Sequence, residues 1–113
     1  MSQRHCLTLD LKNDPALIAE YKRYHENVWP EIKQSLRDAG IENMEIYLWG
    51  TRMFMIIETG DSFSFAKKAE LDRNNPKVQE WENLMGKFQQ PLSKDPRAEE
   101  RWLPMQRVFK FSA

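Results

Sequence analysis

Cysteine, net charge and long apolar runs are what this sequence lacks. Its 113 residues include a single cysteine, so an internal disulfide is excluded and a reducing, cytoplasmic location is favoured. Lysine plus arginine and aspartate plus glutamate both number 17, and a chain without net charge is not typical of nucleic-acid binding. The apolar runs are too short to span a membrane, and the N-terminus shows no apolar signal region. We therefore expect a cytoplasmic protein with neither membrane nor nucleic acid as a partner.

Sequence signatures of cofactor and metal chemistry are lacking as well. The four glycines stand singly, so there is no phosphate-binding glycine loop, and no Gly-x-Ser-x-Gly element marks a hydrolase nucleophile. His5 and His25 are the two histidines, and neither belongs to a close-spaced metal motif such as His-x-x-x-His. We therefore expect no metal and no cofactor. The length is that of one domain, spanning 1–113, which is large enough for an apolar core.

The periodicity of the apolar residues predicts four strands and the order βαββαβ. Alternation with period two predicts strands over residues 4–11, 42–49, 52–58 and 105–111. Gly50 and Thr51 join the second and third of these as a hairpin. Residues 53–57 are apolar on both faces, as expected of a central strand that is buried on both sides.

Helical spacing predicts two consecutive helices between the first and second strands. Asp14 is a good cap for the first helix, which is expected to end near His25. Asn27 can cap a second helix with Pro30 in its first turn. Gly40 ends the run as a C-terminal glycine.

The second half of the chain predicts two more helical stretches and a loop. Asp61 or Ser62 is expected to cap a helix that ends near Leu71, and after Pro76 a helical stripe runs through residues 78–88. Residues 91–104 are interpreted as a surface loop. Its charge run is interpreted as solvated and consists of Arg97, Glu99, Glu100 and Arg101.

This element order is that of the ferredoxin-like plait, an α+β fold in which helices cover one face of an antiparallel sheet. The opposite face carries Cys6, Thr8 and the outward apolar residues of the third strand, and it needs cover of its own. A homodimer that packs sheet against sheet, a dimeric α/β-barrel, would provide this cover. The closed interior would then accommodate a small ligand.

The segment from Tyr21 to Glu31 is the most informative in the chain. Tyr21 and His25 lie four residues apart, so both side chains project from one face of a helix. His25 is expected at a helix C-terminus, where the cation is favoured and the pKa of the imidazole rises. A titratable imidazole beside a phenol and the indole of Trp29 indicates an acid–base site. The alternative interpretation is an ordinary core stripe.

Trp81 is the second candidate for a functional side chain. It belongs to the last helical stripe, from which it could meet the first helix or the sheet across a shared cleft. Indole faces and phenol hydroxyls complement the apolar C–H faces and the polar rims of sugars. The alternative interpretation is that Trp81 is a core anchor, as aromatic residues in a helical stripe usually are.

The chain resembles the L-rhamnose mutarotase family over nearly its whole length. The resemblance rests on Tyr21-x-x-x-His25-x-x-x-Trp29-Pro30-Glu31, on Glu45-Ile46-Tyr47-Leu48 and on Trp81. It implies a dimeric plait that interconverts the α and β anomers of a 6-deoxy-L-hexose, L-rhamnose or L-fucose, in sugar catabolism. It also implies that His25 is the proton donor and that Tyr21 and Trp81 help to hold the sugar.

Two positions depart from the rhamnose enzymes. Met44 stands where they carry a tyrosine, and Glu82 stands where they carry a second tryptophan after Trp81. Both positions contact the sugar in that family, and discrimination between sugars depends on paired hydroxyl partners. We therefore assign Met44 and Glu82 to substrate selection. The branch of the family that the chain resembles most is one associated with L-fucose, so L-fucose is the expected substrate.

Anomer exchange requires two proton transfers, and the sequence identifies the group for only one of them. Ring opening needs a proton delivered to the ring oxygen and another removed from the anomeric hydroxyl. His25 is assigned as acid/base and Tyr21 as hydroxyl binder or proton relay. Tyr47, which we also count among the substrate-binding residues, or water would supply the second transfer.

Two other functions are compatible with this sequence. One is a cofactor-independent monooxygenase on the same dimeric plait, which would need an apolar cavity around His25. The other is a non-catalytic sugar-binding module, in which Trp81 binds the sugar and His25 has no chemical role. Following optical rotation after adding the protein to freshly dissolved sugar separates a mutarotase from a module that only binds.

Overall fold

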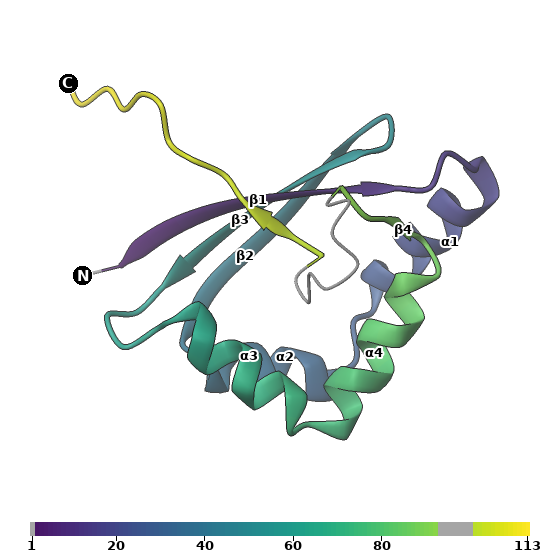
Figure 1. The fold of residues 1–113 in the computed structure, drawn as a ribbon, viewed down its shortest axis with the longest axis horizontal. Coiled ribbons are helices and arrows are strands. Elements are labelled where there is room, and N and C mark those ends of the chain that lie inside the picture. Colours follow the sequence, from purple (N-terminus) through teal and green to yellow (C-terminus); the bar gives the residue numbers. More distant parts are fainter. Residues whose placement is uncertain (1, 93–100) are drawn as a thin grey trace.

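The computed structural model describes residues 2–92 and 101–113 and shows an antiparallel sheet with all of its described helices on one side (Figure 1). Among the described residues, five strands make up the sheet: β1 (Gln3–Leu11), β2 (Ile41–Trp49), β3 (Arg52–Thr59), β4 (Gln89–Gln90) and β5 (Leu103–Pro104). The strand order is β2-β3-β1-β4, and β5 also pairs with β1. This is the order of a ferredoxin-like plait, so the predicted α+β fold is confirmed.

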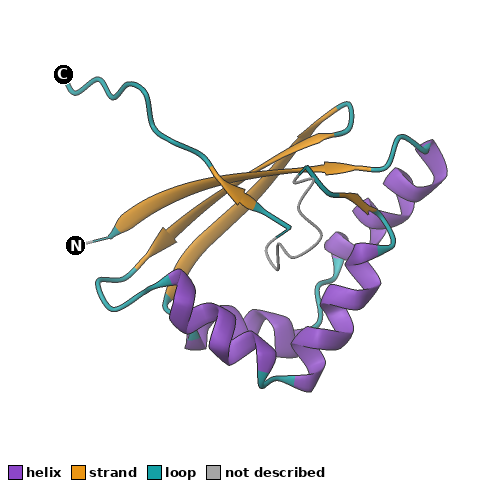
Figure 2. Ribbon diagram, in the orientation of Figure 1, coloured by secondary structure: helices purple, strands orange, loops and turns teal. Residues whose placement is uncertain are grey.

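The helices lie in two consecutive pairs along the chain. They are α1 (Pro15–Glu26), α2 (Pro30–Asp38), α3 (Phe65–Arg73) and α4 (Pro76–Gly86). The purple helices of Figure 2 line the same face of the sheet, so the opposite face has no described helix over it. None of the helices in the described ranges is long and apolar enough to cross a membrane.

The edge of the sheet beside β1 is built from two short strands separated by residues 91–102. β4 pairs with Asp10 and Leu11, and β5 pairs with Leu7 and Thr8. The predicted closing strand over 105–111 is therefore wrong. One further backbone bond, from Met105 N to the Cys6 carbonyl oxygen at 2.7 Å, ends the pairing. Beyond it the exposed N-terminal residues of β1 are polar, so they offer no apolar surface to the side chains of this segment.

Most helix ends lie where the sequence predicts them. The side chain of Asp14 accepts hydrogen bonds from the backbone N–H groups of Ala16 and Leu17, at 2.9 and 3.4 Å, and so caps α1. Asn75 caps α4 in the same way. Gly40 follows α2 with φ +93°, a conformation that glycine adopts without strain.

Two predicted caps are wrong. Asn27 follows α1 as its C-cap, and α2 begins at Pro30 without a side-chain cap. The third helix is capped by Ser64, whose hydroxyl accepts from Lys67 N at 3.1 Å, rather than by Asp61 or Ser62. The physical reason is that the preceding residue, Phe63, packs against the apolar cluster under the sheet, so the chain turns into the helix only after it.

The hairpin of β2 and β3 gives the sheet two different faces. Gly50 in the turn has φ +61°, and the register pairs Tyr47 with Phe54. On the helix side, Met53 and Ile57 of β3 are buried. On the other side, Phe54 and Ile56 are half-buried although no described element lies over them. β3 lies between β2 and β1, so its prediction as a central strand is confirmed.

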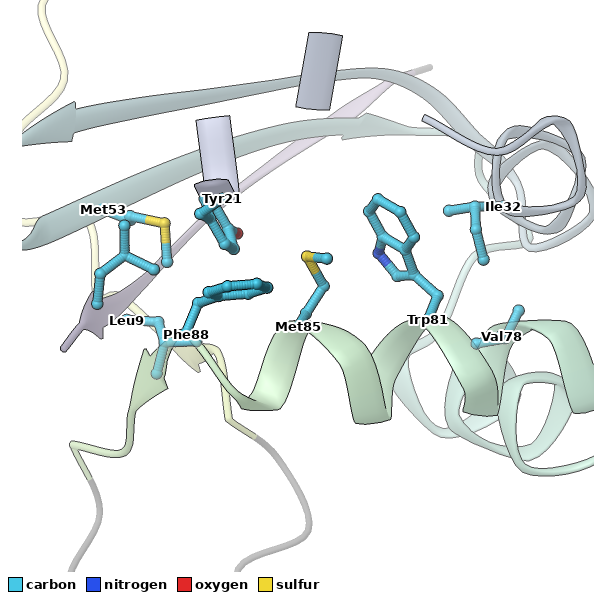
Figure 3. Packing of buried hydrophobic residues seen from close by; sticks show 9 residues of the cluster. Leu9, Tyr21, Ile32, Met53, Val78, Trp81, Met85 and Phe88 are labelled. Atoms are coloured by element: carbon cyan, nitrogen blue, oxygen red, sulfur yellow. The ribbon is translucent and has the colours of Figure 1, made fainter. Parts of the chain in front are cut away.

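The apolar interior lies between the sheet and the helices, and the described part of the chain forms two clusters in it. The larger one joins the end of β1 to α1, α2 and α4, and Figure 3 shows its side chains meeting between the layers. Its buried members are Leu9, Leu11, Tyr21, Ile32, Met53, Val78, Trp81, Met85 and Phe88. The smaller one has Leu7, Ile41 and Ile57 as its buried members. The candidate functional residues of α1 and α4 therefore belong to the larger cluster.

Candidate active site

Tyr21 and His25 lie side by side on the inner face of α1. Their spacing of one helical turn brings the ring centroids to 4.3 Å, with an angle of 31° between the ring planes. Tyr21 is buried, with 5% of its surface exposed, and its ring also meets Phe88 edge-on at 6.0 Å. His25 is only half-buried. The imidazole is therefore the more accessible member of the pair.

Trp81 of α4 closes the cluster from the opposite helix. Its ring meets His25 edge-on at a centroid distance of 5.6 Å and meets Trp29 in the same way at 5.1 Å. Tyr24 contacts it as well, at 6.5 Å. Only 7% of Trp81 is exposed, so the indole is a core anchor whose edge borders the imidazole. Figure 3 shows it beside Met85 between the helix and the sheet layer.

A backbone contact determines which nitrogen of His25 carries the proton. Nδ1 lies 2.8 Å from the backbone carbonyl oxygen of Tyr21. A carbonyl oxygen only accepts, so Nδ1 must donate, and the neutral ring then has its lone pair on Nε2. The arrangement leaves His25 as a neutral base at Nε2, with Nδ1 already bonded to a group that would also stabilise the cation.

The pKa of His25 is lowered from 6.5, chiefly by burial, while the bond to the Tyr21 carbonyl acts weakly in the opposite direction. The predicted rise in the pKa is therefore wrong. The helix C-terminus does favour the cation, but the aromatic rings of Tyr21 and Trp81 exclude the water that would solvate it. In this environment the neutral imidazole is the resting form at neutral pH.

Two polar side chains act on the phenol of Tyr21. They are Glu82, which belongs to α4, and Gln89, which follows this helix. The pKa of Tyr21 is raised to about 12, chiefly by burial. A hydrogen bond with the Gln89 side chain lowers this pKa, whereas the charge of Glu82 raises it further. Gln89 is the first residue of β4 and is 4% exposed. With a pKa near 12 the hydroxyl keeps its proton at neutral pH, so it serves as a hydrogen-bond donor or acceptor rather than as an anion.

Glu82 is half-buried beside this phenol and is not a solvated helix residue. Burial raises the pKa of its carboxyl group, while the charges of Lys68 and Arg101 act to lower it. Lys68 comes from α3 and also pairs with Asp72 at 2.6 Å. The carboxyl group of Glu82 thus lies close enough to a phenol and two cations to interact with their charges, and it can accept a hydrogen bond from a ligand hydroxyl.

Arg101 is a member of the site that sequence reasoning missed. Its Nη1 donates to the backbone carbonyl oxygen of Glu82 at 2.7 Å and to Oε1 of Gln89 at 3.3 Å. The interpretation of Arg101 as part of a solvated charge run is therefore wrong, because its half-buried guanidinium is bound to α4 and β4. The other charged residues of that run, Arg97, Glu99 and Glu100, lie outside the described residues.

Met44 and Tyr47 are not brought into this cluster. Met44 is half-buried on the helix side of β2, where it packs against the smaller apolar cluster, apart from Tyr21 and Trp81. Tyr47 lies on the other face of the sheet, 55% exposed, and its hydroxyl donates to Glu45. The predicted residues that the fold does gather are Tyr21, His25, Trp81 and Glu82.

Gln89 and Arg101 were missed for different reasons. Gln89 interrupts the apolar stripe directly after Phe88, and a polar residue at the end of such a stripe is the signal that could have indicated it. Arg101 has no such signal because the charges around it read as a solvated loop. Only the tertiary structure places it over α4.

Two cavities among the described residues lie away from this cluster. One, of about 310 Å³, is lined by Trp29 together with the outer side of α4. The other, of about 670 Å³, lies between the start of β1 and the C-terminal segment. No group of three or more histidine, cysteine, aspartate or glutamate side chains within the described ranges is arranged to hold a metal ion.

Comparison with known proteins assigns the chain to a family. The family model described as L-rhamnose mutarotase matches residues 4–111. The chain belongs to the L-rhamnose mutarotase family. This match confirms the resemblance that the sequence analysis described. Mutarotases are isomerases, so the chain belongs to a family of enzymes.

The chain is similar to individual members of this family. The chain is 42% identical over 112 residues to an L-fucose mutarotase of Xanthomonas campestris pv. campestris, covering 97% of this chain and 89% of that protein. An L-rhamnose mutarotase of Acidiphilium cryptum is 51% identical, but over 35 residues, 31% of this chain and 34% of that protein. The crystal structure of an L-rhamnose mutarotase from Formosa agariphila has the same fold, with a TM-score of 0.72, 22% identity, and coverage of 97% of this chain and 99% of that one.

The protonation state of His25 is directly testable. We expect its imidazole to titrate below 6.5 and to carry its neutral-form proton on Nδ1, because burial disfavours the cation and the Tyr21 carbonyl accepts from Nδ1. Long-range ¹H–¹⁵N NMR over a pH series measures both quantities. Replacing Trp81 with alanine admits water to the ring and should return the pKa toward its ordinary value. Titration above 6.5, or a proton on Nε2, would contradict the assignment.

Proposed function

We propose that this mutarotase interconverts the α and β anomers of a 6-deoxy-L-hexose and prefers L-fucose to L-rhamnose. The observation that carries the proposal is the neutral imidazole of His25, whose Nε2 is left as a base while Nδ1 is bonded to the Tyr21 carbonyl. The phenol of Tyr21 and the indole edge of Trp81 border the imidazole, and the carboxyl group of Glu82 acts on the phenol. These groups suit a small polyol, and an acid–base reaction is the chemistry that they support.

His25 begins the reaction as the base. Its Nε2 removes the proton of the anomeric hydroxyl, the bond between the anomeric carbon and the ring oxygen breaks, and the ring oxygen takes a proton from the Tyr21 hydroxyl or from water. The resulting aldehyde rotates, and the C5 hydroxyl closes on its other face. In that step the C5 hydroxyl returns its proton to the donor, and the imidazolium returns its proton to the former carbonyl oxygen. The carbonyl of Tyr21 stabilises that imidazolium through Nδ1. Acid–base catalysis of this kind contributes roughly 10²–10⁴-fold, which suffices for a reaction that already proceeds in water.

The remaining residues bind and orient the sugar in this proposal. Tyr21, whose hydroxyl stays protonated, donates a hydrogen bond to a sugar oxygen and can relay a proton through it. Trp81 holds the imidazole ring in place through an edge-on contact. Tyr47 lies on the far face of the sheet, so we assign it no role at the His25 of its own protomer.

Glu82 is the residue to which we assign the choice between the two sugars. L-Fucose and L-rhamnose share the methyl group and differ in the orientation of ring hydroxyls, so a site tells them apart by the acceptors it places around the ring. The carboxyl group of Glu82 is such an acceptor and lies close enough to Tyr21 to influence its pKa. Met44 packs against the smaller apolar cluster, so we assign this choice to Glu82 and not to Met44.

Two surfaces support a homodimer. The sheet face opposite the helices carries Phe54 and Ile56 without any described element over it. The C-terminal segment, residues 105–113, leaves the sheet and exposes Val108, Phe109 and Phe111 by 91%, 77% and 74%. Apolar side chains gathered in this way are uncommon on a monomer. A second copy that covers the outer sheet face and receives the C-terminal segment would bury both.

A cytoplasmic role in sugar catabolism stays a prediction.

The assignment of His25 is tested by replacing it with asparagine, which keeps a polar side chain of similar reach but has no titratable nitrogen. Anomer exchange measured by NMR with L-fucose should fall by at least tenfold because the base is lost. His5→Asn is the matched control, since His5 packs against Phe63 and Phe65 away from the cluster. Retention of more than about a tenth of the wild-type rate would contradict the role of His25.

Substrate preference is tested by comparing the two sugars at equal concentration. L-Fucose should exchange about tenfold faster, since an unpaired polar group in the site costs roughly 1–3 kcal/mol. Glu82→Trp should shift the preference toward L-rhamnose. Glu80→Trp on the exposed side of the same helix is its control and should leave the preference unchanged. Equal or faster exchange of L-rhamnose by the wild-type protein would overturn this choice.

The homodimer is tested by sedimentation at micromolar concentration, where the wild type should have twice the chain mass. Replacing Phe109 and Phe111 together with aspartate should dissociate the dimer, because charges would enter the proposed apolar interface. Gln106→Asp, an exposed polar residue of the same segment, is the control and should remain dimeric. A monomeric wild type rules out the proposed assembly.

A further inference from the structure

The hydrogen bonds of Arg101 fix the orientation of a buried amide. Gln89 is 4% exposed, and its Oε1 accepts from Nη1 of Arg101 at 3.3 Å. A guanidinium has only donors, so the oxygen of the amide must face Arg101. The NH₂ group of Gln89 is then directed to its other partner, which is the phenol of Tyr21. Arg101 thus determines which end of the amide Tyr21 meets.

The direction of the bond between Gln89 and Tyr21 follows from this orientation. The NH₂ group can only donate, so the phenolic oxygen accepts from it. A bond of this sense favours the anionic phenol, in accord with the lowering effect that Gln89 has on the pKa of Tyr21. The oxygen is thereby occupied, while the hydrogen of the hydroxyl stays available to be donated. Within the described ranges the structure shows no hydrogen bond that uses this hydrogen.

Gly86 provides the space in which Arg101 lies. The guanidinium rests against this last residue of α4, and a Cβ built at Gly86 would be 2.6 Å from Nη1 of Arg101. This distance is far below van der Waals contact, so any side chain at this position would displace the guanidinium. The second bond of Arg101, to the Glu82 carbonyl oxygen at 2.7 Å, anchors it to the same helix.

We propose that Arg101 and Gln89 are positioning residues that direct the hydroxyl hydrogen of Tyr21 toward the sugar, in a space left open by Gly86. In this arrangement Tyr21 is the donor to the ring oxygen as the ring opens, and His25 is the base at the anomeric hydroxyl. The protons balance because the C5 hydroxyl formed on ring opening returns the proton to Tyr21 as the ring recloses, while the imidazolium of His25 returns its proton to the carbonyl oxygen. The proposal rests on the mutarotase function proposed above.

Gln89→Glu is the deciding variant. It keeps the size of the side chain and strengthens the contact with Arg101, so a purely structural role predicts a stable protein of normal activity. A carboxylate has no donor, however, and would take the hydrogen of Tyr21 for itself. We therefore expect kcat for L-fucose to fall at least tenfold while KM changes less than threefold. Gln90→Glu, at the exposed neighbour, is the matched control and should behave as the wild type.

A second readout does not depend on the sugar. With tyrosine labelled at ¹³Cζ, the Tyr21 resonance should move in Gln89→Glu and in Gln89→Met, because the bond to its oxygen is reversed or lost. It should stay in place in Gln90→Glu. Gly86→Ala should move it in the same way, with helix content unchanged, since alanine is a good helix former and acts here only by displacing Arg101. Arg101→Lys keeps a donor and should retain more activity than Arg101→Met.

Each outcome bears on one proposal. Wild-type kcat in Gln89→Glu, or a Tyr21 resonance that does not respond to either Gln89 substitution, would overturn the positioning role. If the wild type accelerates neither L-fucose nor L-rhamnose, the proposed function fails. The Tyr21 resonance would in that case still decide whether Arg101 and Gln89 set the direction of the hydroxyl.

Discussion

The properties of this protein depend on the enclosure of polar groups between a sheet and helices that lie on one side of it. Tyr21 and Gln89 are both at most 5% exposed, in the same layer as Leu9, Met53 and Phe88. Polar groups that lose water in such a place must be paired within the protein, because an unpaired buried group is costly. The pairing then determines proton positions that solvent would otherwise leave free.

That constraint acts on each functional group in a definite direction. For His25 it disfavours the cation and bonds Nδ1 to a carbonyl oxygen, which leaves a base at Nε2. For Tyr21 it raises the pKa to about 12, so the resting phenol keeps its proton and can donate it. For Glu82 it favours a carboxyl group that is less readily ionised than usual. One layer of the fold thus produces a base, a donor and an acceptor around a single aromatic cluster.

On the opposite face of the sheet, apolar side chains lack the cover that the helices give to the inner face. With all described helices on one side, Phe54 and Ile56 have no cover of their own, and the C-terminal segment finds no apolar surface along β1. Burying both in a second copy would give the sheet two covered faces, as sheets with apolar residues on both sides generally have. The same asymmetry explains why Tyr47, on the outer face, is remote from His25.

The sequence by itself determined most of the local structure and the site residues that lie together on one helix. The cap at Asp14, the turn at Gly50 and the pairing of Tyr21 with His25 depend on neighbours within a few residues, so their spacing is sufficient to predict them. The α+β order also followed from periodicity. Apart from the caps predicted at Asn27 and at Asp61 or Ser62, the departures concern residues whose partners are distant in the chain. The sequence could not predict that the end of the chain leaves the sheet, because its pairing depends on the N-terminal residues of β1, which are distant in the chain.

Only the tertiary structure decided the chemistry of the site. Whether the pKa of His25 rises or falls depends on how much water Trp81 excludes, and Trp81 comes from another helix. Arg101 reads as solvated in its own segment, yet it binds Gln89 and the carbonyl of Glu82 across the gap to α4. Solvation and hydrogen-bond direction are properties of the assembled interior. A sequence specifies them only through the packing of segments that are far apart along it.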